Sequence, residues 1–409
     1  MIEGTADGLE AAERPRARRV EALALPALLA FTLGYRLWAR GRGAPLGGFD
    51  ERLYVQFAQA FGLGGLPALR DLLARYPTDP VLHHGPLPLR LLWVWASALA
   101  CRLADRCDAS ALAGLSWIAG LATVPVAWLL FRRWLPPAPA FLGGLLVAVS
   151  PLATDLSQRA LQDSFFTFWV VASVLFLERS RDGGLADRLA LAGCVLAALL
   201  SKELMVLLLP LLAVALGRPT ARVWRTLLAL ALAALAAFAV LAVAAGGVSN
   251  LLHVYAEYGR SEASQPYTDQ FQRGPWFRYL VDLLLVSPAT LLAALAGLSL
   301  GGLDEALRPG LRRAALFGAG GLAIFSVQPS LNVRFVLFAD VLLRALAAAG
   351  VFALAGRAPP GWRSRLVALN AALLLGVEVV QFHRLFDVGR IYDPVTAELI
   401  QADGMVRWR

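Results

Sequence analysis

Two adjacent carboxylates, Asp50 and Glu51, follow the first long apolar segment of the chain, residues 22–39. A charge beside a bilayer usually has either an ionic partner or a chemical task. One interpretation makes Asp50 a general base that takes the proton of an attacking hydroxyl, with Glu51 orienting Asp50 or the acceptor. The alternative is that both residues solvate a loop or cap the helix that begins there. The dipeptide alone favours the alternative, so the rest of the chain has to decide.

Two cations could hold a phosphate near those carboxylates. Lys202 is the only lysine in the chain and interrupts an apolar run, where burying a charge costs about 2.5–3.5 kcal/mol. A compact ammonium suits a phosphate, but neutralisation by the neighbouring Glu203 would explain it equally well. Arg334 enters another apolar segment and could donate to phosphate oxygens or form a structural ion pair. Spacing alone leaves both alternatives open for both residues.

Other polar residues have a structural explanation beside the functional one. Arg159 and Asp163 are four residues apart, so on a helix they would share a face and pair with each other. His84 follows another histidine and precedes Gly-Pro, which sets a turn more plainly than it forms a metal site. The run that includes Arg273 is aromatic and basic, as is typical of a helix entering the membrane at its interface.

The composition places the chain in a membrane. Of its 409 residues 58% are hydrophobic and 16% charged, with a mean hydropathy of +0.62, whereas soluble domains have about 25% charged residues. The net charge of +9 comes from arginines in short loops between apolar runs. That pattern is typical of topology determinants and headgroup contacts and excludes a nucleic-acid partner. No glycine-rich nucleotide-binding motif is present.

The apolar pattern predicts an all-α polytopic membrane protein of about eleven transmembrane helices. The expected spans are residues 22–39, 111–131, 138–152, 163–178, 187–200, 204–217, 225–246, 276–299, 313–328, 335–355 and 365–382. Residues 87–104 are apolar too, but we expect them to lie at the interface. If they do not cross, every arginine cluster in the loops falls on the cytoplasmic side with the N-terminus.

This topology divides the chain into three parts. Residues 1–21 form a cytoplasmic basic leader, residues 22–382 the transmembrane domain, and residues 383–409 a short extracytoplasmic tail. The transmembrane domain includes a first outer loop, residues 41–110, and a long outer loop, residues 247–277. The polar residues that are hard to explain all fall on the outer side. We therefore expect an integral protein of a bacterial inner or plasma membrane, with its active site on the extracytoplasmic face.

The residue types on that face suit the transfer of a group from a lipid phosphate to a hydroxyl, because a carboxylate can take the proton and cations can stabilise the departing phosphate. No metal site is legible from the three cysteines and four histidines. The pair Asp50 and Glu51 leaves a divalent cation, Mg²⁺ or Mn²⁺, open, so no cofactor is firmly predicted. Cys101 and Cys107 are close enough to pair, and the sequence leaves open whether they do.

The order of several motifs resembles the C-type (GT-C) membrane glycosyltransferases, in the group of protein O-mannosyltransferases and aminoarabinose transferases. These motifs are Phe49-Asp50-Glu51-Arg52-Leu53-Tyr54, His84-Gly85-Pro86-Leu87-Pro88-Leu89, Ser150-Pro151 with Arg159-Ala160-Leu161-Gln162-Asp163, Ser201-Lys202-Glu203, Gly274-Pro275-Trp276 to Tyr279, and Arg334-Phe335. His84 stands where many members have a lysine, and the C-terminal soluble domain of some members is missing. The resemblance covers most of the chain.

The resemblance implies an inverting transfer of a hexosyl or pentosyl group from a polyprenyl-phosphate sugar to a protein, glycan or lipid, with Asp50 as base and Glu51 beside it. Phosphate contacts are then expected from Lys202, Arg334, His84 and Arg273, and substrate contacts from Asp163, Arg159, Tyr54 and Tyr279. The rival interpretation is a non-catalytic flippase, transporter or assembly subunit. Transporters usually show repeated halves with charges near the membrane midplane, and no repeat is visible here.

Overall fold

Every regular element that the computed structural model describes is a helix. It describes residues 6–218, 220–301, 305, 307–402 and 404, with side chains from residue 23 onward. The prediction of an all-α membrane protein is confirmed within this part of the chain. The expected basic leader, residues 1–21, lies outside the described side chains.

Each expected span coincides with a helix or a pair of helices. These are α1 (Ala6–Ala39), α5 (Ala109–Trp134), α6 (Pro137–Ala148), α8 (Asp163–Ser180), α9 (Leu185–Ser201), α10 (Leu209–Ala215), α11 (Ala221–Ala245), α13 (Arg278–Val286) with α14 (Pro288–Gly301), α15 (Arg308–Phe325), α16 (Leu337–Gly356) and α17 (Pro360–Phe382). Within the described residues four helices are long and apolar enough to cross a membrane, or five if α13 and α14, which are bent by 118° relative to each other, form one broken span. Eleven crossings therefore remain a prediction.

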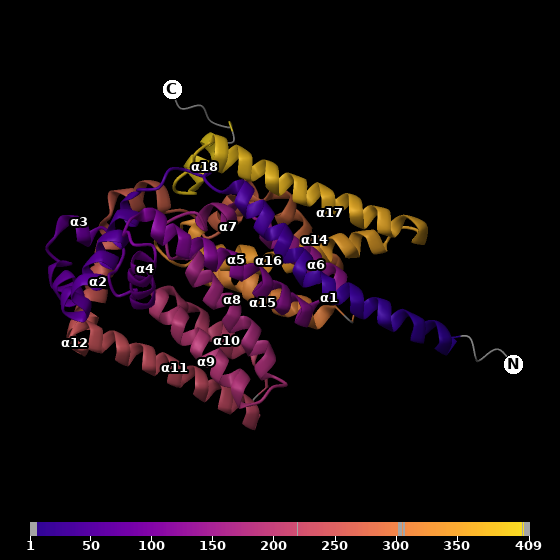
Figure 1. Cartoon of the computed structure of the whole chain (residues 1–409), viewed down its shortest axis with the longest axis horizontal. Helices are drawn as coiled ribbons and strands as arrows, with labels where there is room; N and C mark the ends of the chain where they lie inside the picture. The colour runs from indigo at the N-terminus through magenta and orange to yellow at the C-terminus, as the bar shows by residue number, and fades with distance from the viewer. Residues whose placement is uncertain (1–5, 219, 302–304, 306, 403, 405–409) are drawn as a thin grey trace.

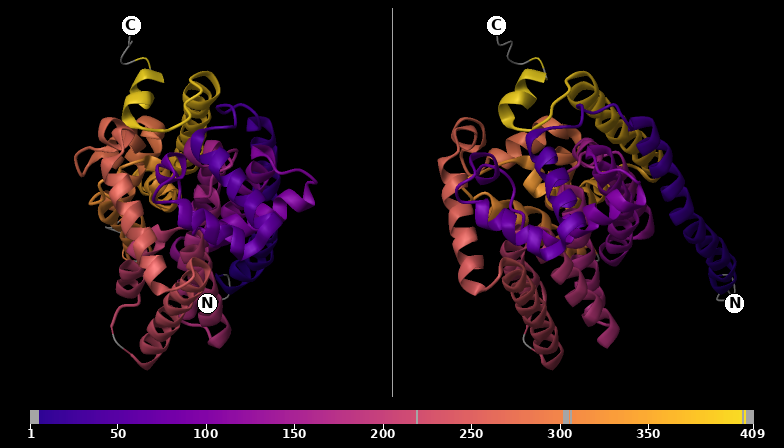
Figure 2. Two further views of the ribbon diagram at one scale, coloured as in Figure 1. Left: turned by 90° about the vertical axis from the view of Figure 1, so that its left-hand side faces the viewer. Right: turned by 60° about the vertical axis from the view of Figure 1, so that its left-hand side comes forward.

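The remaining elements gather toward one end of the bundle (Figure 1). They are α2 (Phe49–Arg75), α3 (Pro80–His83), α4 (Leu91–Leu103), α7 (Pro151–Leu156), α12 (Val248–Ser264) and α18 (Thr396–Ala402), with η1 (Glu203–Leu208), η2 (Thr268–Gln272), η3 (Val333–Val336) and η4 (His383–Val388). Figure 2 shows that the C-terminal segment returns over this end, while the N-terminal end of α1 projects from the other. The ends of the bundle are therefore built differently.

The helix expected over residues 87–104 begins at Leu91, as α4, and packs against α2. Its later start follows from Pro86 and Pro88, because proline lacks a backbone donor and restricts the residue before it. Cys101, in α4, forms a disulfide with Cys107, which answers the question that the sequence left open. The disulfide closes the turn between α4 and α5.

Helix α16 occupies the centre of the bundle and packs on α6, α14, α15 and α17. Its crossing with α14 is close because glycines line it: a Cβ added to Gly350 would collide with the carbonyl of Ala293, and one added to Gly297 with the carbonyl of Leu346. Small residues allow such close approach between helices in a membrane. By contrast, only 22% of the apolar window of α17 is buried, so α17 lies on the outside of the bundle.

A charged group lies inside this packed region, and we call its members, Asp340, Arg344 and Glu378, the bundle cluster. Arg344 is fully buried and pairs with Asp340 at 3.0 Å and with Glu378 at 2.7 Å. Ser287, at the break between α13 and α14, donates to Glu378 at 3.0 Å and accepts from Arg344 at 3.1 Å. The bundle cluster therefore holds the bent pair against α16 and α17.

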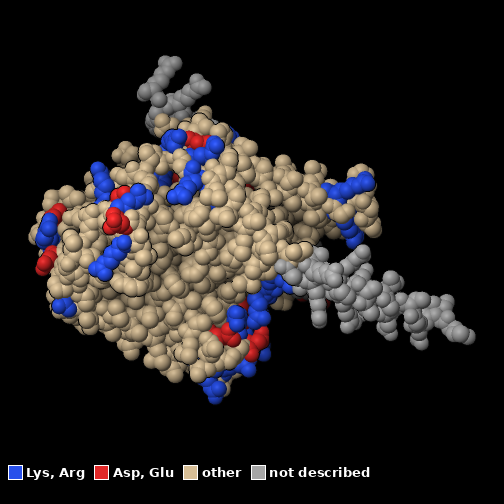
Figure 3. All heavy atoms as spheres, viewed as in Figure 1, with Lys and Arg blue, Asp and Glu red and all other residues tan. Residues whose placement is uncertain are grey.

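The surface between the two ends of the bundle is a broad band with few charged side chains (Figure 3). One group of charged side chains surrounds α2, α4 and α18, and the other surrounds the loops near α9, α10 and the start of α17. This distribution is typical of a protein that crosses a bilayer. The second group includes the arginines expected on the cytoplasmic side, and the N-terminal end of α1 lies toward the same end.

Candidate active site

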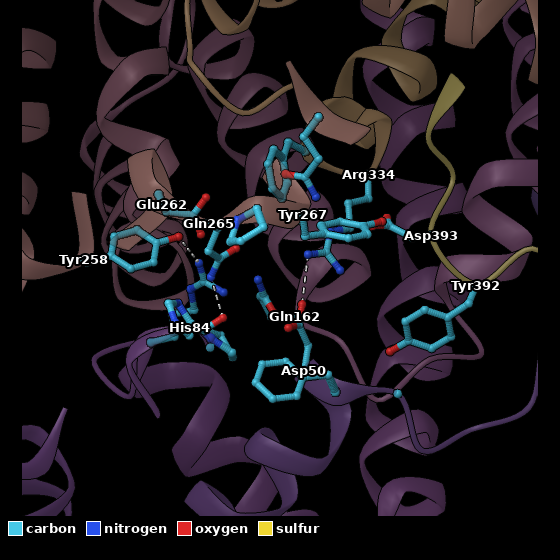
Figure 4. A pocket seen from close by; sticks show the side chains of 18 of the residues that line it. Asp50, His84, Gln162, Tyr258, Glu262, Gln265, Tyr267, Arg334, Tyr392 and Asp393 are labelled. Carbon is cyan, nitrogen blue, oxygen red and sulfur yellow. Dashed lines mark hydrogen bonds and ion pairs between the residues drawn. The ribbon is translucent and has the colours of Figure 1, made fainter. Parts of the chain in front are cut away.

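A cavity of about 540 Å³ opens at the end of the bundle opposite the N-terminal end of α1. Three residues expected from the sequence line it: Asp50, His84 and Arg334. Its other walls come from α12, from the segment around η2 and from the C-terminal tail. Figure 4 shows the labelled side chains converging on the same space from these separate segments.

Asp50 and Arg334 form an ion pair in the cavity. Asp50 is the second residue of α2 and accepts a hydrogen bond from Arg334 Nη2 at 2.9 Å. The two side chains remain 23% and 16% exposed. The side chain of Asn332 accepts a hydrogen bond from the backbone amide of Arg334 at 3.1 Å. The Nε of Arg334 is buried and has no partner in the described residues. The guanidinium therefore keeps unused hydrogen-bonding capacity.

Glu51 points away from the cavity and binds backbone amides. Its Oε2 accepts from Gly47 at 2.6 Å and from Gly48 at 2.9 Å, and its Oε1 accepts from Ala160 at 2.9 Å. It is fully buried and completes the capping box of α2, in which a side chain at the third helical position binds the residue before the helix. The two interpretations of the dipeptide thus divide between its members, because Glu51 caps while Asp50 faces the cavity.

Lys202 and Glu203 do not pair with each other. Lys202 Nζ donates to Asp163 at 2.6 Å, with both side chains almost completely buried. Glu203 pairs with Arg90 at 2.6 Å, and Arg90 also donates to the hydroxyl of Tyr54. Of these residues only Arg90 lines the cavity. Lys202 lies behind the cavity wall, with its ammonium 4.5 Å from the ring centre of Phe335, a lining residue.

Arg159 pairs with Asp155 at 3.2 Å rather than with Asp163. The expected pairing fails because the chain turns between α7 and α8, so the two residues do not lie on one continuous helix. Arg159 also donates to the carbonyl of Ile391 at 2.9 Å and lies over the ring of Tyr392 at 4.4 Å. It therefore fastens the C-terminal tail beside the cavity and does not line it.

The remaining expected residues lie at different depths. The Nδ1 of His84 lies 3.5 Å from the hydroxyl of Ser261 on α12, at the cavity wall. Arg273 is half exposed and pairs with Asp269 at 2.7 Å, outside the cavity lining. Tyr54 and Tyr279 are buried in the two hydrophobic cores. These two tyrosines therefore do not line the cavity.

Several lining residues were missed by sequence reasoning, namely Gln162, Tyr258, Glu262, Tyr392, Asp393 and Glu398. Gln162 stood inside a quoted motif without a role. The last three belong to the tail, which looked like a short appendage because no apolar period marks it. Asp393 accepts hydrogen bonds from Tyr267 and Asn332, so the tail is joined to η2 and η3. The sequence predicts that this tail is extracytoplasmic. A tyrosine and two carboxylates in such a segment were the signal that could have identified these residues.

The carboxyl groups opposite Asp50 have no cationic partner at hydrogen-bond distance among the described residues. Burial raises the pKa of Glu262, although the nearby Arg90 opposes the shift. Burial, and then the charge of Asp393, raises the pKa of Glu398 to about 7. The pKa of Tyr392 is also raised, by burial and then by Glu51 and Asp50, so its hydroxyl stays protonated at neutral pH. The cavity therefore combines one available guanidinium with acids of different strength.

The geometry gives little support to a metal site at the adjacent carboxylates. Glu51 binds backbone amides while Asp50 binds Arg334, so their oxygens do not converge as metal ligands would. In the part of the chain that the structure describes, no group of three or more His, Cys, Asp or Glu side chains could hold a metal ion. A divalent cation therefore enters no step proposed below.

Comparisons with known proteins assign the fold. A family model described as dolichyl-phosphate-mannose-protein mannosyltransferase matches residues 86–245. The structure resembles ArnT from Cupriavidus metallidurans, with a TM-score of 0.55 and 16% identity over 93% of this chain and 74% of that one. It also resembles the Archaeoglobus fulgidus oligosaccharyltransferase, with a TM-score of 0.62 and 12% identity over 88% of this chain and 54% of that one. The chain therefore shares the fold of these two proteins, and residues 86–245 match the mannosyltransferase family model.

With its long apolar helices the chain is an integral membrane protein, and it spans about half the length of the archaeal relative. One ArnT structure of similar likeness, with a TM-score of 0.54 and 16% identity over 93% of this chain and 75% of that one, contains undecaprenyl phosphate. A complex of the archaeal enzyme AglB, with a TM-score of 0.59 and 12% identity over 92% of this chain and 56% of that one, contains an inhibitory peptide and a dolichol-phosphate. A comparison of the sequence with curated proteins finds no significant match.

Proposed function

We propose that this chain is a GT-C glycosyltransferase that moves a sugar from a polyprenyl-phosphate donor to an acceptor hydroxyl on the extracytoplasmic face. The observation that carries the proposal is the Asp50–Arg334 pair, 2.9 Å apart in a cavity at one end of the bundle. A base and a phosphate-binding cation next to each other are what such a transfer requires. The relatives whose structures contain a polyprenyl phosphate support this choice of donor.

The ion pair suggests how donor binding prepares the base. Arg334 holds Asp50 in the free protein, and a guanidinium forms strong, often bidentate hydrogen bonds with phosphate. When the donor phosphate takes Arg334 as its partner, the carboxylate of Asp50 becomes free to accept a proton. The base is thereby active only when the donor is present.

The transfer then proceeds by inversion at the anomeric carbon. Asp50 takes the proton of the acceptor hydroxyl, and the acceptor oxygen forms a bond to the anomeric carbon. The bond from that carbon to the phosphate oxygen breaks, and Arg334 stabilises the charge left on the lipid phosphate. Glu51 holds the loop that presents Asp50, and the buried Lys202–Asp163 pair supports the wall behind Arg334 through Phe335.

The test uses purified protein in lipid vesicles with a panel of polyprenyl-phosphate hexoses and pentoses. We expect one donor to be consumed by the wild type, and Asp50→Asn to bind that donor while losing about 10²- to 10⁴-fold in turnover. Asp71→Asn is the matched control, because Asp71 is an exposed aspartate on the same helix, α2. If Asp50→Asn keeps full activity, Asp50 is not the base. If no donor binds, the transferase proposal is wrong and a flippase or assembly role explains the chain better.

A further inference from the structure

Gln162 is a buried polar side chain of the cavity that the proposed transfer does not use. It is 3% exposed, lines the cavity, and has an Oε1 that is buried without a hydrogen-bond partner in the described residues. Figure 4 places it next to Asp50, and none of the hydrogen bonds drawn there reaches it. A buried amide oxygen without a hydrogen-bond partner is costly, so its presence at this position calls for a partner that binds in the cavity.

The backbone around Gln162 is held from both sides, which fixes where the amide lies. The residue before it, Leu161, accepts at 2.7 Å from the hydroxyl of Ser116. The residue after it, Asp163, pairs with Lys202 at 2.6 Å. The carbonyl of Gln162 itself accepts from the amide of Phe166 in the first turn of α8, at 2.7 Å. The side chain is therefore presented from a rigid support, as a recognition group requires.

The chemistry of an amide selects the kind of group that it would bind. An amide is uncharged and carries an acceptor beside a donor, which matches a sugar hydroxyl and not a phosphate. The phosphate already has a charged partner in Arg334, which pairs with Asp50. A group that lies next to Asp50 but does not carry the phosphate charge is the sugar ring, close to the carbon at which the proposed reaction occurs.

We propose that Gln162 recognises the transferred sugar by hydrogen-bonding, through its side-chain amide, to a hydroxyl group near the reacting carbon. This inference rests on the proposed function, because it assigns the position of the sugar in the same cavity. Gln162 is then a specificity-determining residue, and donors that lack the contacted hydroxyl bind more weakly.

Gln158 provides a matched control from the same loop. Its amide is satisfied, because its Oε1 accepts from the backbone of Gly41 at 2.7 Å and its Nε2 donates to the carbonyl of Thr154 at 3.3 Å. Gln158 is half-buried and does not line the cavity. Gln158→Met and Gln162→Met therefore remove the same amide, once from a structural position and once from the proposed sugar site.

The experiment measures binding of two lipids, the polyprenyl-phosphate sugar and the same polyprenyl phosphate without sugar. We expect Gln162→Met to weaken binding of the first by up to about tenfold, the loss of one hydrogen bond, and to leave binding of the second unchanged. Gln158→Met should leave the preference for the sugar-bearing lipid unchanged. An equal loss for both lipids, or no loss for either, would overturn the proposal and make the amide a support for Asp50.

Deoxy donors extend the test to the wild-type protein, where folding of a variant is not in question. One deoxy donor should bind the wild type as weakly as the complete donor binds Gln162→Met. For that deoxy donor, Gln162→Met and the wild type should have the same affinity. If Gln162→Met weakens the binding of every deoxy donor by the same factor, relative to the wild type, the proposal fails. A wild type that binds the donor but never transfers its sugar would contradict the proposed function and leave this binding result standing.

Discussion

The bundle cluster and the cavity are both groups of charges in an apolar chain, yet their hydrogen bonding differs. Arg344 uses its guanidinium fully: it binds Asp340 and Glu378, the carbonyl of Leu146 at 3.0 Å and the hydroxyl of Ser287 at 3.1 Å. Arg334 has one ion pair, with Asp50, and an Nε without a partner in the described residues. The guanidinium of the bundle cluster therefore has all its hydrogen bonds satisfied, whereas the guanidinium of the cavity has an unused donor.

Burial alone therefore does not mark a functional charge in this chain. Charges inside a membrane protein are expensive and often mark a functional site, but the bundle cluster is accounted for by the bend between α13 and α14 that it stabilises. The cavity has no such structural account for Asp50, Glu262 or Glu398. Incomplete partnering beside a cavity is therefore the better indicator of function here.

The largest effect is expected from opening the bundle cluster. Arg344→Met leaves the carboxylates of Asp340 and Glu378 buried without their cation. Removing one partner of a buried ion pair costs about 3–5 kcal/mol, and two carboxylates place this variant at the upper end. We expect a large fall in the unfolding temperature of the purified protein.

Neutralising the two carboxylates as well separates charge from packing. The triple variant Arg344→Met, Asp340→Asn, Glu378→Gln removes the uncompensated charges and should recover part of the lost stability, since apolar and neutral replacements of a buried pair are often tolerated. Donor binding per folded molecule should be unchanged. A folded Arg344→Met protein that has lost donor binding would show that the bundle cluster belongs to the functional site.

Lys202 tests whether a fully partnered cation can also act on the donor. Lys202→Met leaves Asp163 as an unpaired carboxylate in a buried position, so we expect a loss of about 3 kcal/mol in stability, read as a lower unfolding temperature. Adding Asp163→Asn should restore much of it. If the single variant instead remains stable and only the Michaelis constant for the donor rises, Lys202 contacts the donor phosphate as the sequence suggested.

Arg334 should show the opposite balance. Arg334→Met removes the proposed phosphate ligand but leaves Asp50 in a cavity where it is 23% exposed, so water can solvate it. We expect a rise of about 10- to 100-fold in the Michaelis constant for the donor, the loss of one strong charge-assisted contact. The unfolding temperature should change far less than in Lys202→Met. A large drop in stability without an effect on donor binding would make this pair structural.

The sequence predicted the helices well because apolar length and arginine placement are local signals. It also predicted that Asp50 and Arg334 lie on one face, and the structure brings them into contact across 284 residues of chain. The pairing of the other charges was less predictable, since Lys202, Glu203, Arg159 and Asp163 each had more than one possible partner. Which pair forms depends on the turn between α7 and α8 and on the approach of α4, neither of which is visible as a period.

The tail was missed for a different physical reason. Residues 383–409 include the cavity residues Tyr392, Asp393 and Glu398, but their apolar residues form no long run that would predict a span. Leu385, Phe386, Ile391 and Leu399 are nevertheless buried in the large hydrophobic core, and Arg159 binds the carbonyl of Ile391 at 2.9 Å. Short apolar groups that pack on distant elements give no periodic signal in the sequence.

The smallest effect is expected at Glu398, and it concerns how firmly the tail closes the cavity. Because the pKa of Glu398 is raised from 4.5 to about 7 in the folded protein, the folded state holds the proton more tightly than the unfolded state. Docking of the tail is therefore strongest below pH 4.5 and weakens as the pH rises to about 7. Hydrogen exchange at the amides of residues 391–402 should accelerate over this interval beyond the intrinsic pH dependence of exchange. In Glu398→Gln that additional acceleration should vanish, because the amide does not titrate. If the additional acceleration persists in Glu398→Gln, the titration of another group controls how firmly the tail docks. The other unpaired carboxylates of the cavity wall then have to be tested one by one.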